Sequence, residues 1–339
     1  MRIKKNKVFI VAEIGNNHEG NLSNAFKLID KAKETGVDAV KFQTYDVKKY
    51  YSSNTDKKRI KRLVKFQLSY SSIIKLSKYA KKLGLVFFST PFDEESAVFL
   101  NKIQNIFKIS SGDNDFYNLI EKVLIFNKPI IISTGMMDFK EVKKLYHFIK
   151  KKKFKNQICL LHCVSSYPVP INQLNLNSIR FLKEKLPDCI IGYSDHSDSI
   201  ESCILAAHLG ANIIEKHFTL DKNFSSFRDH KLSANPAEMK RLVETIRNLK
   251  TILGKKQKKI QKSEKDALTA SRRSIAANKI LKKNTIVRPN DILYVRPRTM
   301  FSIFDEKKII GKKINKTMKY GEQFKIKNLI KNDYCSNSS

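Results

Sequence analysis

The chain has 339 residues, of which 41% are hydrophobic and 10% aromatic, enough to bury one large core or two smaller ones. With 11 Gly, 8 Pro and no apolar stretch of membrane-spanning length, the sequence does not fit collagen-like, linker-dominated or membrane-spanning proteins. The basic N-terminus leads into an apolar run that Glu13 interrupts too early for a signal peptide. We therefore expect a cytoplasmic protein with no membrane partner.

The chain is strongly basic, because it contains 66 Lys and Arg residues but only 32 Asp and Glu residues, which gives a formal net charge of +34. Such an excess raises the question of a nucleic-acid partner. The excess is spread along the chain in several runs, among them residues 48–65, beside abundant Asn, Ile and Ser. We expect a solvated lysine surface and no nucleic-acid partner. A basic nucleic-acid-binding protein stays open as the alternative, and the salt dependence of binding to random duplex DNA would separate the two.

The five cysteines are odd in number and form no CxxC pair, so we expect neither a disulfide framework nor a structural zinc site. They are Cys159, Cys163, Cys189, Cys203 and Cys335.

Eight short runs rich in β-branched residues predict strands. They span residues 8–14, 39–43, 85–89, 106–110, 130–134, 158–163, 189–193 and 212–217. Helical periodicity fills the segments between them, for example over 21–36, 71–84, 139–153 and 236–254. Near-continuous apolar strands alternating with helices indicate a parallel sheet covered on both faces. Eight such units in about 250 residues favour a closed (β/α)8 barrel of the TIM type, an α/β fold.

The character of the sequence changes near residue 255. We assign residues 1–254 to the barrel, 255–271 to a polar linker and 272–335 to a small β-rich domain. Within that domain, residues 282–292 and 319–330 form a weak pseudo-repeat. A domain of this size is too small for a deep site of its own, so we expect the barrel to hold the chemistry.

Polar residues follow almost every predicted strand, where a (β/α)8 barrel carries its active site. Lys41 and Lys108, with hydroxyls at neighbouring strand ends, predict a cationic basin for a small substrate that carries phosphate and carboxylate. The hydroxyls are those of Thr90, Ser111, Ser133 and Ser194. His196 and His217 end adjacent strands and could share one divalent metal ion, or each could be a hydrogen-bonded pocket histidine.

At these positions the sequence resembles the bacterial sialic acid synthase family, in which a C-terminal antifreeze-protein-like (SAF) domain follows the barrel. The resemblance covers nearly the whole chain. Its motifs are AEIGNNHEGN (12–21), VKFQTY (40–45), FFSTPFD (87–93), KISSGD (108–113), KPIIISTGM (128–136), LLHCVSSYPVP (160–170), IGYSDHS (191–197) and EKHFTLDKN (215–223). RRSIAANKILKK, VRP and IIGKKI match the second domain.

The resemblance implies a cytoplasmic transferase that joins phosphoenolpyruvate to an N-acyl mannosamine-type sugar. It implies Mn²⁺ or Mg²⁺ on His196 and His217, and catalytic roles for Glu13, Lys41 and Asp113. It also implies a homodimer with exchanged C-terminal domains. Phosphoenolpyruvate contacts carry over to Lys41, Thr90, Lys108, Ser111, Ser133 and Ser194, and sugar contacts to Gln43, Tyr167, Asp229 and Arg296. We expect Glu13 to be ionised among these cations, or else to be only a structural bridge to Lys41.

The sequence departs from the family pattern on the expected sugar side. Asp113 stands where many members have glutamate, Ser165 where many have asparagine, and Arg228 where the GPDH segment has proline. RPRTMFSI replaces the RPGxGI pattern around Arg296.

We therefore expect N-acetylneuraminate synthase activity on N-acetylmannosamine, with a legionaminic or pseudaminic acid synthase acting on a diacetamido-trideoxy hexose as the alternative. A synthase for a sugar phosphate would need further basic residues for a second phosphate.

Overall fold

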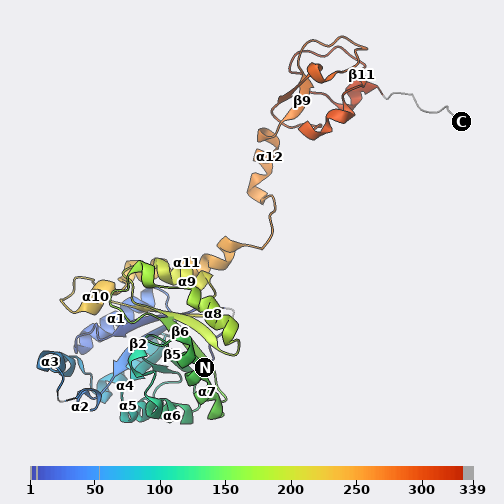
Figure 1. Cartoon of the computed structure of the whole chain (residues 1–339). Coiled ribbons are helices and arrows are strands. Elements are labelled where there is room, and N and C mark those ends of the chain that lie inside the picture. Colours follow the sequence, from blue (N-terminus) through green and yellow to red (C-terminus); the bar gives the residue numbers. More distant parts are fainter. Residues whose placement is uncertain (1, 5–6, 53, 331–339) are drawn as a thin grey trace. The chain divides into compact units, whose positions relative to one another are not determined.

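A computed structural model of the chain describes residues 2–4, 7–52 and 54–330 (Figure 1). The chain divides into two compact units, residues 1–254 and 255–339. Cys335 and the last residues of the predicted second domain lie outside the described residues.

The first unit alternates strands with helices. Its strands are β1 (Phe9–Gly15), β2 (Ala39–Thr44), β3 (Val86–Pro91), β4 (Phe107–Ile109), β5 (Ile130–Ser133), β6 (Ile158–Cys163), β7 (Ile190–Asp195) and β8 (Ile213–His217). Its α-helices are α1 (Leu22–Glu34), α2 (Val47–Tyr50), α3 (Lys57–Phe66), α4 (Tyr70–Lys82), α5 (Glu94–Asn101), α6 (Tyr117–Ile125), α7 (Phe139–Lys151), α8 (Asn177–Lys185), α9 (Glu201–His208), α10 (Arg228–Leu232) and α11 (Pro236–Leu253). Every predicted strand is present to within two residues at either end.

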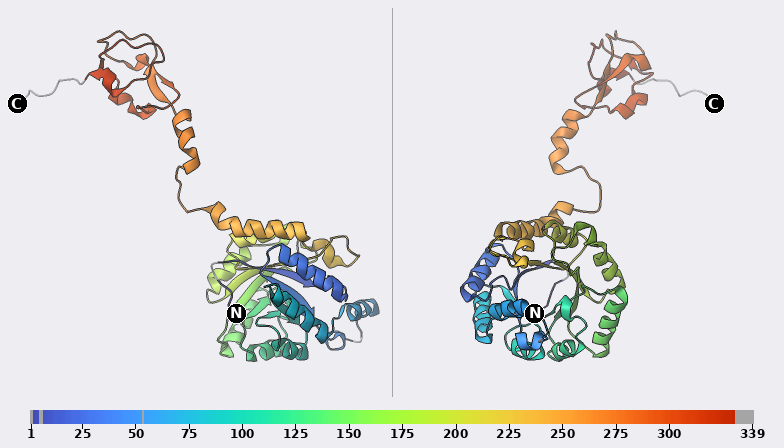
Figure 2. Two further views of the ribbon diagram at one scale, coloured as in Figure 1. Left: turned by 180° about the vertical axis from the view of Figure 1, so that it is seen from behind. Right: turned by 60° about the vertical axis from the view of Figure 1, so that its left-hand side comes forward.

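The eight strands form one parallel sheet in the order β3-β2-β1-β8-β7-β6-β5-β4. The two ends of this order, β3 and β4, contact each other, so the sheet curves into a nearly closed barrel. Helices surround the strands as a ring in the right-hand view of Figure 2. The predicted TIM-barrel class is confirmed.

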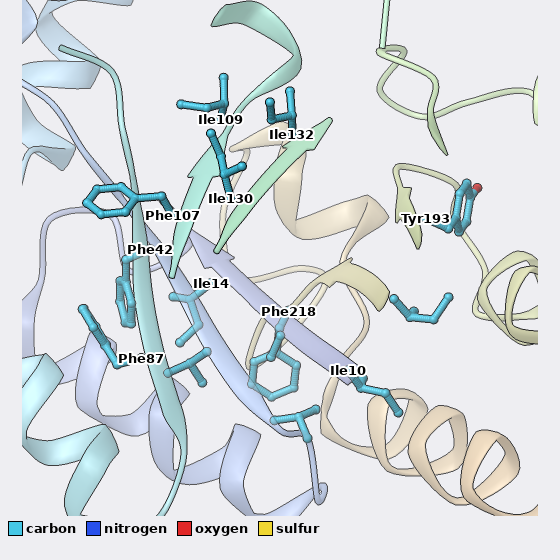
Figure 3. Packing of buried hydrophobic residues seen from close by; sticks show 14 of the residues in the cluster. Ile10, Ile14, Phe42, Phe87, Phe107, Ile109, Ile130, Ile132, Tyr193 and Phe218 are labelled. Atoms are coloured by element: carbon cyan, nitrogen blue, oxygen red, sulfur yellow. The ribbon is translucent and has the colours of Figure 1, made fainter. Parts of the chain in front are cut away.

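Successive side chains of each strand alternate between the barrel interior and the layer beneath the helices. The outward layer is a large apolar core that includes Ile10, Ile14, Phe42, Phe87 and Phe107 (Figure 3). The lower interior is filled by a second apolar cluster made of Ile3, Phe9, Val11, Ala39, Phe88, Ile106, Ile131, Cys159, Leu161, Ile190 and Ile213. Further along the strands, toward their C-terminal ends, the inward-facing positions carry polar side chains instead.

One inward position cannot carry a side chain. A Cβ built on Gly192 in β7 would lie 2.5 Å from Leu161 Cδ2 and 2.7 Å from the Ile213 carbonyl oxygen. A glycine therefore interrupts the apolar run of β7 because the neighbouring strands β6 and β8 already fill the space.

The segment between β2 and β3 holds three helices where the sequence predicted only the third. Asp56 caps the N-terminus of the unexpected helix α3, because its side chain accepts a hydrogen bond from the backbone N–H of Lys58. Its residues Ile60 and Leu63 pack against a small cluster of Tyr45, Val47 and Phe92.

The second unit contains the helix α12 (Lys265–Ser271) and two small antiparallel sheets. The sheets pair β9 (Ser274–Ala277) with β10 (Ile292–Val295), and β11 (Lys313–Ile314) with β12 (Leu329–Ile330). The pseudo-repeat is present in three dimensions. Asn284 and Gly321 both adopt positive φ, and Val287 and Phe324, at equal spacing from them, are both buried.

Cys159, Cys163 and Cys203 are buried thiols. Among the described residues, no helix combines the length and the apolar character needed to cross a bilayer.

Candidate active site

A cavity of about 400 Å³ opens at the C-terminal ends of the barrel strands. Eleven residues predicted from the sequence line it, and they come from seven of the eight strands or from the loops that follow them. They are Glu13, Lys41, Gln43, Lys108, Ser111, Ser133, Tyr167, Ser194, His196, His217 and Asp229. The barrel therefore brings together residues that are up to 216 positions apart in the chain.

Two lysines and two carboxylates form the floor of the cavity. Glu215 Oε1 lies 3.5 Å from Lys41 Nζ and 3.4 Å from Lys108 Nζ, and Ser194 Oγ donates to the same oxygen at 3.1 Å. Glu13 Oε2 lies 2.8 Å from Lys41 Nζ. All four charged side chains are almost completely buried. An uncompensated charge at such depth is costly, so these groups hold one another in place.

Burial and charge set the ionisation of these groups. Burial raises the pKa of Glu13 to about 7, against the opposing attraction of Lys41. Burial acts in the same sense on Glu215, but Lys108 and Lys41 outweigh it and hold its pKa below the ordinary value. Burial lowers the pKa of Lys108, whereas the carboxylates outweigh burial at Lys41 and raise its pKa. With a pKa of about 7, Glu13 carries a proton part of the time near neutral pH, because desolvation exceeds the attraction of the neighbouring lysine.

The floor is consequently positive when Glu13 carries a proton, since Lys41 and Lys108 then face only the Glu215 carboxylate. Hydroxyl groups stand beside it. Ser133 Oγ is buried and has no hydrogen-bond partner within the described residues. Ser111 Oγ accepts from the backbone N–H of Gly135 at 3.2 Å and keeps its own hydrogen to donate. This surface is suited to a small anion.

His196 and His217 stand on one wall with ring centroids 5.5 Å apart. His196 Nδ1 lies 2.9 Å from the Val164 carbonyl oxygen, which assigns the ring hydrogen to Nδ1 and leaves Nε2 with a lone pair. His217 Nδ1 is buried and without a hydrogen-bond partner among the described residues. Burial, and next the charge of His196, hold the pKa of His217 well below its ordinary value, so this imidazole is neutral. A neutral imidazole with a free ring nitrogen is metal-ligand chemistry. Burial acts to lower the pKa of His196, but Cys163 and the Val164 carbonyl outweigh it and raise that pKa, so His196 binds a metal only after losing its second proton.

The described residues contain no cluster of three or more His, Cys, Asp or Glu side chains arranged around one point as metal ligands. Any metal held by His196 and His217 would take its other ligands from substrate and water, as an open site does.

A chain of hydrogen bonds fixes the amide of Gln43. Asn16 Nδ2 donates to Gln43 Oε1 at 2.8 Å, and Gln43 Nε2 donates to Glu13 Oε1 at 3.3 Å. Tyr45 donates from its hydroxyl to Asn16 Oδ1 at 3.3 Å. These contacts link the outer part of the cavity to Glu13.

The histidine wall continues through Tyr167, Arg228 and Asp229. The Arg228 guanidinium lies 4.6 Å from the centroid of the Tyr167 ring, and Arg228 Nε lies 3.3 Å from Asp229 Oδ1. Tyr167 packs on His196 with ring centroids 4.1 Å apart. The residue that replaces the proline of the family pattern therefore reaches the cavity, and so does Ser165.

Three predicted residues do not line the cavity. Thr90 is buried, is the register partner of Gln43, and receives a hydrogen bond from Lys41 Nζ at 3.3 Å. Asp113 is buried and accepts a hydrogen bond from Ser110 Oγ, and burial raises its pKa. Arg296 lies at the end of the β9–β10 sheet in the second unit.

The site also contains residues to which the sequence analysis gave no role. Glu215 contacts both lysines, and its place two residues before His217 on a strand could have indicated that both face inward. Arg59 and Arg62 reach the cavity from α3, but their charge run favoured a solvated surface. Lys216 and Asp195, at the intervening positions of β8 and β7, form a buried ion pair at 2.5 Å and do not line the cavity.

Fold and cavity together define a (β/α)8-barrel enzyme with a cationic, hydroxyl-rich floor and a two-histidine wall. The NeuB family model matches residues 28–258. The chain is 37% identical over 330 residues to the N,N'-diacetyllegionaminic acid synthase of Campylobacter jejuni, covering 93% of this chain and 98% of the relative. It is 33% identical over 333 residues to the pseudaminic acid synthase of Campylobacter jejuni, covering 94% and 96%.

Among solved structures, the N-acetylneuraminic acid (sialic acid) synthetase of Leptospira borgpetersenii superimposes with a TM-score of 0.71 at 36% identity, over 78% of this chain and 91% of that one. The chain therefore belongs to the NeuB family. It is a phosphoenolpyruvate-dependent transferase of the sugar-acid synthase type.

Proposed function

We propose that this enzyme condenses phosphoenolpyruvate with N-acetylmannosamine to give N-acetylneuraminate and phosphate. A bond forms between C3 of phosphoenolpyruvate and the aldehyde carbon of the open-chain sugar, water adds to C2, and phosphate leaves. The observation that carries the proposal is the division of one cavity into two parts. The Lys41–Glu215–Lys108 floor is suited to an anion, and the wall of His196, Tyr167 and Asp229 is suited to a polyhydroxylated partner.

Phosphoenolpyruvate would lie on the floor, where Lys41 and Lys108 neutralise phosphate and carboxylate. The hydroxyls of Ser111 and Ser133 would donate to the same oxygens, whereas Ser194 donates to Glu215 and helps to hold that carboxylate beside the lysines. Because the two lysines are already placed by buried contacts, they need little rearrangement as charge develops. Thr90 would help to orient the Lys41 ammonium by accepting its hydrogen bond.

His196 and His217 would hold Mn²⁺ or Mg²⁺ through their free ring nitrogens. The fit rests on the buried unpartnered Nδ1 of His217 and on the Nδ1 contact of His196 with the Val164 carbonyl oxygen. When bound, this ion supplies Lewis-acid polarisation of the sugar aldehyde.

Glu13 would move the proton between water and the reacting groups. Its pKa of about 7 lets it lose and regain a proton near neutral pH, which general acid–base chemistry needs. Gln43, held by Asn16, orients the carboxylate. Asp113 would act indirectly, since it does not line the cavity and its hydrogen bond from Ser110 instead shapes the loop that carries Ser111.

The second unit would be an antifreeze-like SAF domain that closes over the barrel of a partner in a homodimer. Arg296 would then donate to the N-acyl oxygen of the sugar bound in the partner's cavity. A polar segment from 255 to 271 gives the reach that such an exchange requires.

A diacetamido-trideoxy hexose is the second candidate sugar, which would make the enzyme a legionaminic or pseudaminic acid synthase. The 37% identity to the legionaminic acid synthase over nearly its whole length favours it, as does Arg228 on the sugar wall. A phosphorylated sugar also belongs in the test, because Arg59, Arg62 and Arg228 line the cavity and supply the extra basic residues that a second phosphate needs.

The test is turnover by purified enzyme with phosphoenolpyruvate and Mn²⁺ across a panel of sugars. The panel contains N-acetylmannosamine, its 6-phosphate and 2,4-diacetamido-2,4,6-trideoxymannose, with products identified by mass spectrometry. We expect the highest kcat/KM with N-acetylmannosamine. A higher value with another sugar would reassign the substrate, and no nonulosonic acid from any sugar would overturn the proposal. Lys41→Met is the matched negative control.

A further inference from the structure

Helix α3 presents four cations on one face. Lys58, Lys61, Arg62 and Lys65 are spaced i, i+3, i+4 and i+7, which places them side by side along the helix. The apolar residues Ile60 and Leu63 pack elsewhere, against the cluster of Tyr45, Val47 and Phe92. The four cations therefore face away from the core together.

These cations line a second cavity of about 550 Å³, which adjoins the active-site cavity. Its remaining wall comes from Glu19, Phe66, Ser225, Ser226 and Phe227. Phe66 is buried and meets Phe227 edge to face with ring centroids 5.2 Å apart. The Arg62 guanidinium lies 5.7 Å from the centroid of the Phe227 ring. The cavity thus combines a packed aromatic pair with a cationic rim.

The positive charge of this rim is not neutralised by the protein. Within the described residues, none of the four cations forms an ion pair with an Asp or Glu side chain. Glu19 is the one acid in the lining, and its Oε1 is already engaged by Ser225 Oγ and by His230 Nε2.

Like charges at these spacings repel one another and disfavour the helix. An anion that bridges them would remove that repulsion, and a concave site with apolar walls concentrates the field.

We propose that this cavity is a second anion-binding site, and that its ligand is a multiply charged phosphate such as a diphosphate group. The volume and four separate cations fit a group larger than one phosphate. A diphosphate can come from inorganic pyrophosphate or from a nucleotide, whose base would reach the exposed part of Phe227. The site adjoins the catalytic cavity, because Arg62 and Phe227 line both.

The test measures binding of pyrophosphate and of ADP to the full-length protein by titration calorimetry, in metal-free buffer at constant ionic strength. The test variant is Lys58→Gln/Lys61→Gln/Lys65→Gln, which spares the residues shared with the catalytic cavity. The matched control is Lys140→Gln/Lys143→Gln/Lys144→Gln, which removes the same charge from exposed positions on α7. Thermal melting of all three proteins verifies that each is folded.

We expect one molecule bound per chain, binding weakened at least about tenfold in the α3 variant, and wild-type affinity in the α7 control. Excess phosphoenolpyruvate should not displace the probe. Tighter binding of ADP than of pyrophosphate would identify a nucleotide as the source of the diphosphate. Equal binding of the two would identify a simple phosphate compound as the source. Either result supports the site. Absence of binding, equal loss in both variants, or displacement by phosphoenolpyruvate would overturn it. None of these readouts depends on turnover of a sugar.

Discussion

Glu13 and Lys41 are register partners on the neighbouring strands β1 and β2, and their charged atoms lie 2.8 Å apart in the floor of the catalytic cavity. Lys41 also reaches Glu215 and Thr90. A single ammonium thus connects Glu13, which we propose transfers the proton, to the proposed anion-binding floor, so substitutions at either end are expected to affect different kinetic constants.

Lys41→Met should raise the KM for phosphoenolpyruvate by about 10- to 100-fold, because it removes a charge-assisted contact to a polyanion. The KM for the sugar should change far less. Initial-rate kinetics with each substrate varied in turn check this, with the exposed Lys144→Met as control and thermal melting to verify folding. Equal effects on both substrates would rule out the floor as the anion site.

The activity should depend on pH through Glu13. If Glu13 accepts a proton as a carboxylate, kcat/KM rises as the pH passes about 7, the pKa to which burial raises this group. Glu13→Gln should lower kcat and remove that inflection. An unchanged pH profile in the variant would assign the inflection to another group.

The stability of the folded protein should also depend on pH through Glu13, and it should fall as the pH rises. The pKa of Glu13 is about 7 in the folded protein and near 4.5 otherwise, so the unfolded chain releases this proton first as the pH rises. The free energy of unfolding of the wild type therefore decreases as the pH rises from about 4.5 to about 7. Over the same range, the stability of Glu13→Gln relative to wild type should rise by up to about 3 kcal/mol. Urea unfolding at pH 4.5 and pH 8 measures the difference, and a constant difference would contradict the raised pKa.

His196→Ala and His217→Ala should each lower kcat at least about 100-fold at fixed metal concentration, as loss of a Lewis acid would. Chelation should abolish turnover of the wild type. Electron paramagnetic resonance of added Mn²⁺ gives a second readout, in which each variant should leave the ion free in solution. The exposed His147→Ala serves as control. Tight Mn²⁺ binding by both variants would show that the metal lies elsewhere.

Arg296 should act on the cavity of a partner chain. Arg296→Ala alone and His217→Ala alone should each be nearly inactive, whereas mixed dimers of the two should regain part of the activity, because one cavity then has both groups intact. Activity of co-expressed, differently tagged chains purified through both tags tests this. Absence of rescue in such dimers would place Arg296 in its own subunit or outside the reaction.

The sequence by itself determined the barrel and most of the strand positions whose polar side chains line the site. Period-two alternation places an apolar residue such as Val11 or Ala39 inside the barrel, and a polar one such as Glu13 or Lys41 two positions later. This pattern depends only on local strand geometry and on the burial of apolar side chains, and both can be predicted from sequence.

The tertiary structure decided which of these polar groups act together. Closure of the barrel brings Glu215 between Lys41 and Lys108, and the neighbouring strand β7 supplies Asp195 as the partner of the outward-facing Lys216. Helix α3 brings Arg59 and Arg62 to the cavity although its charge run is typical of a solvated surface. Such placements depend on contacts between segments far apart in the chain, and the ionisation of Glu13 depends on the burial that those contacts produce.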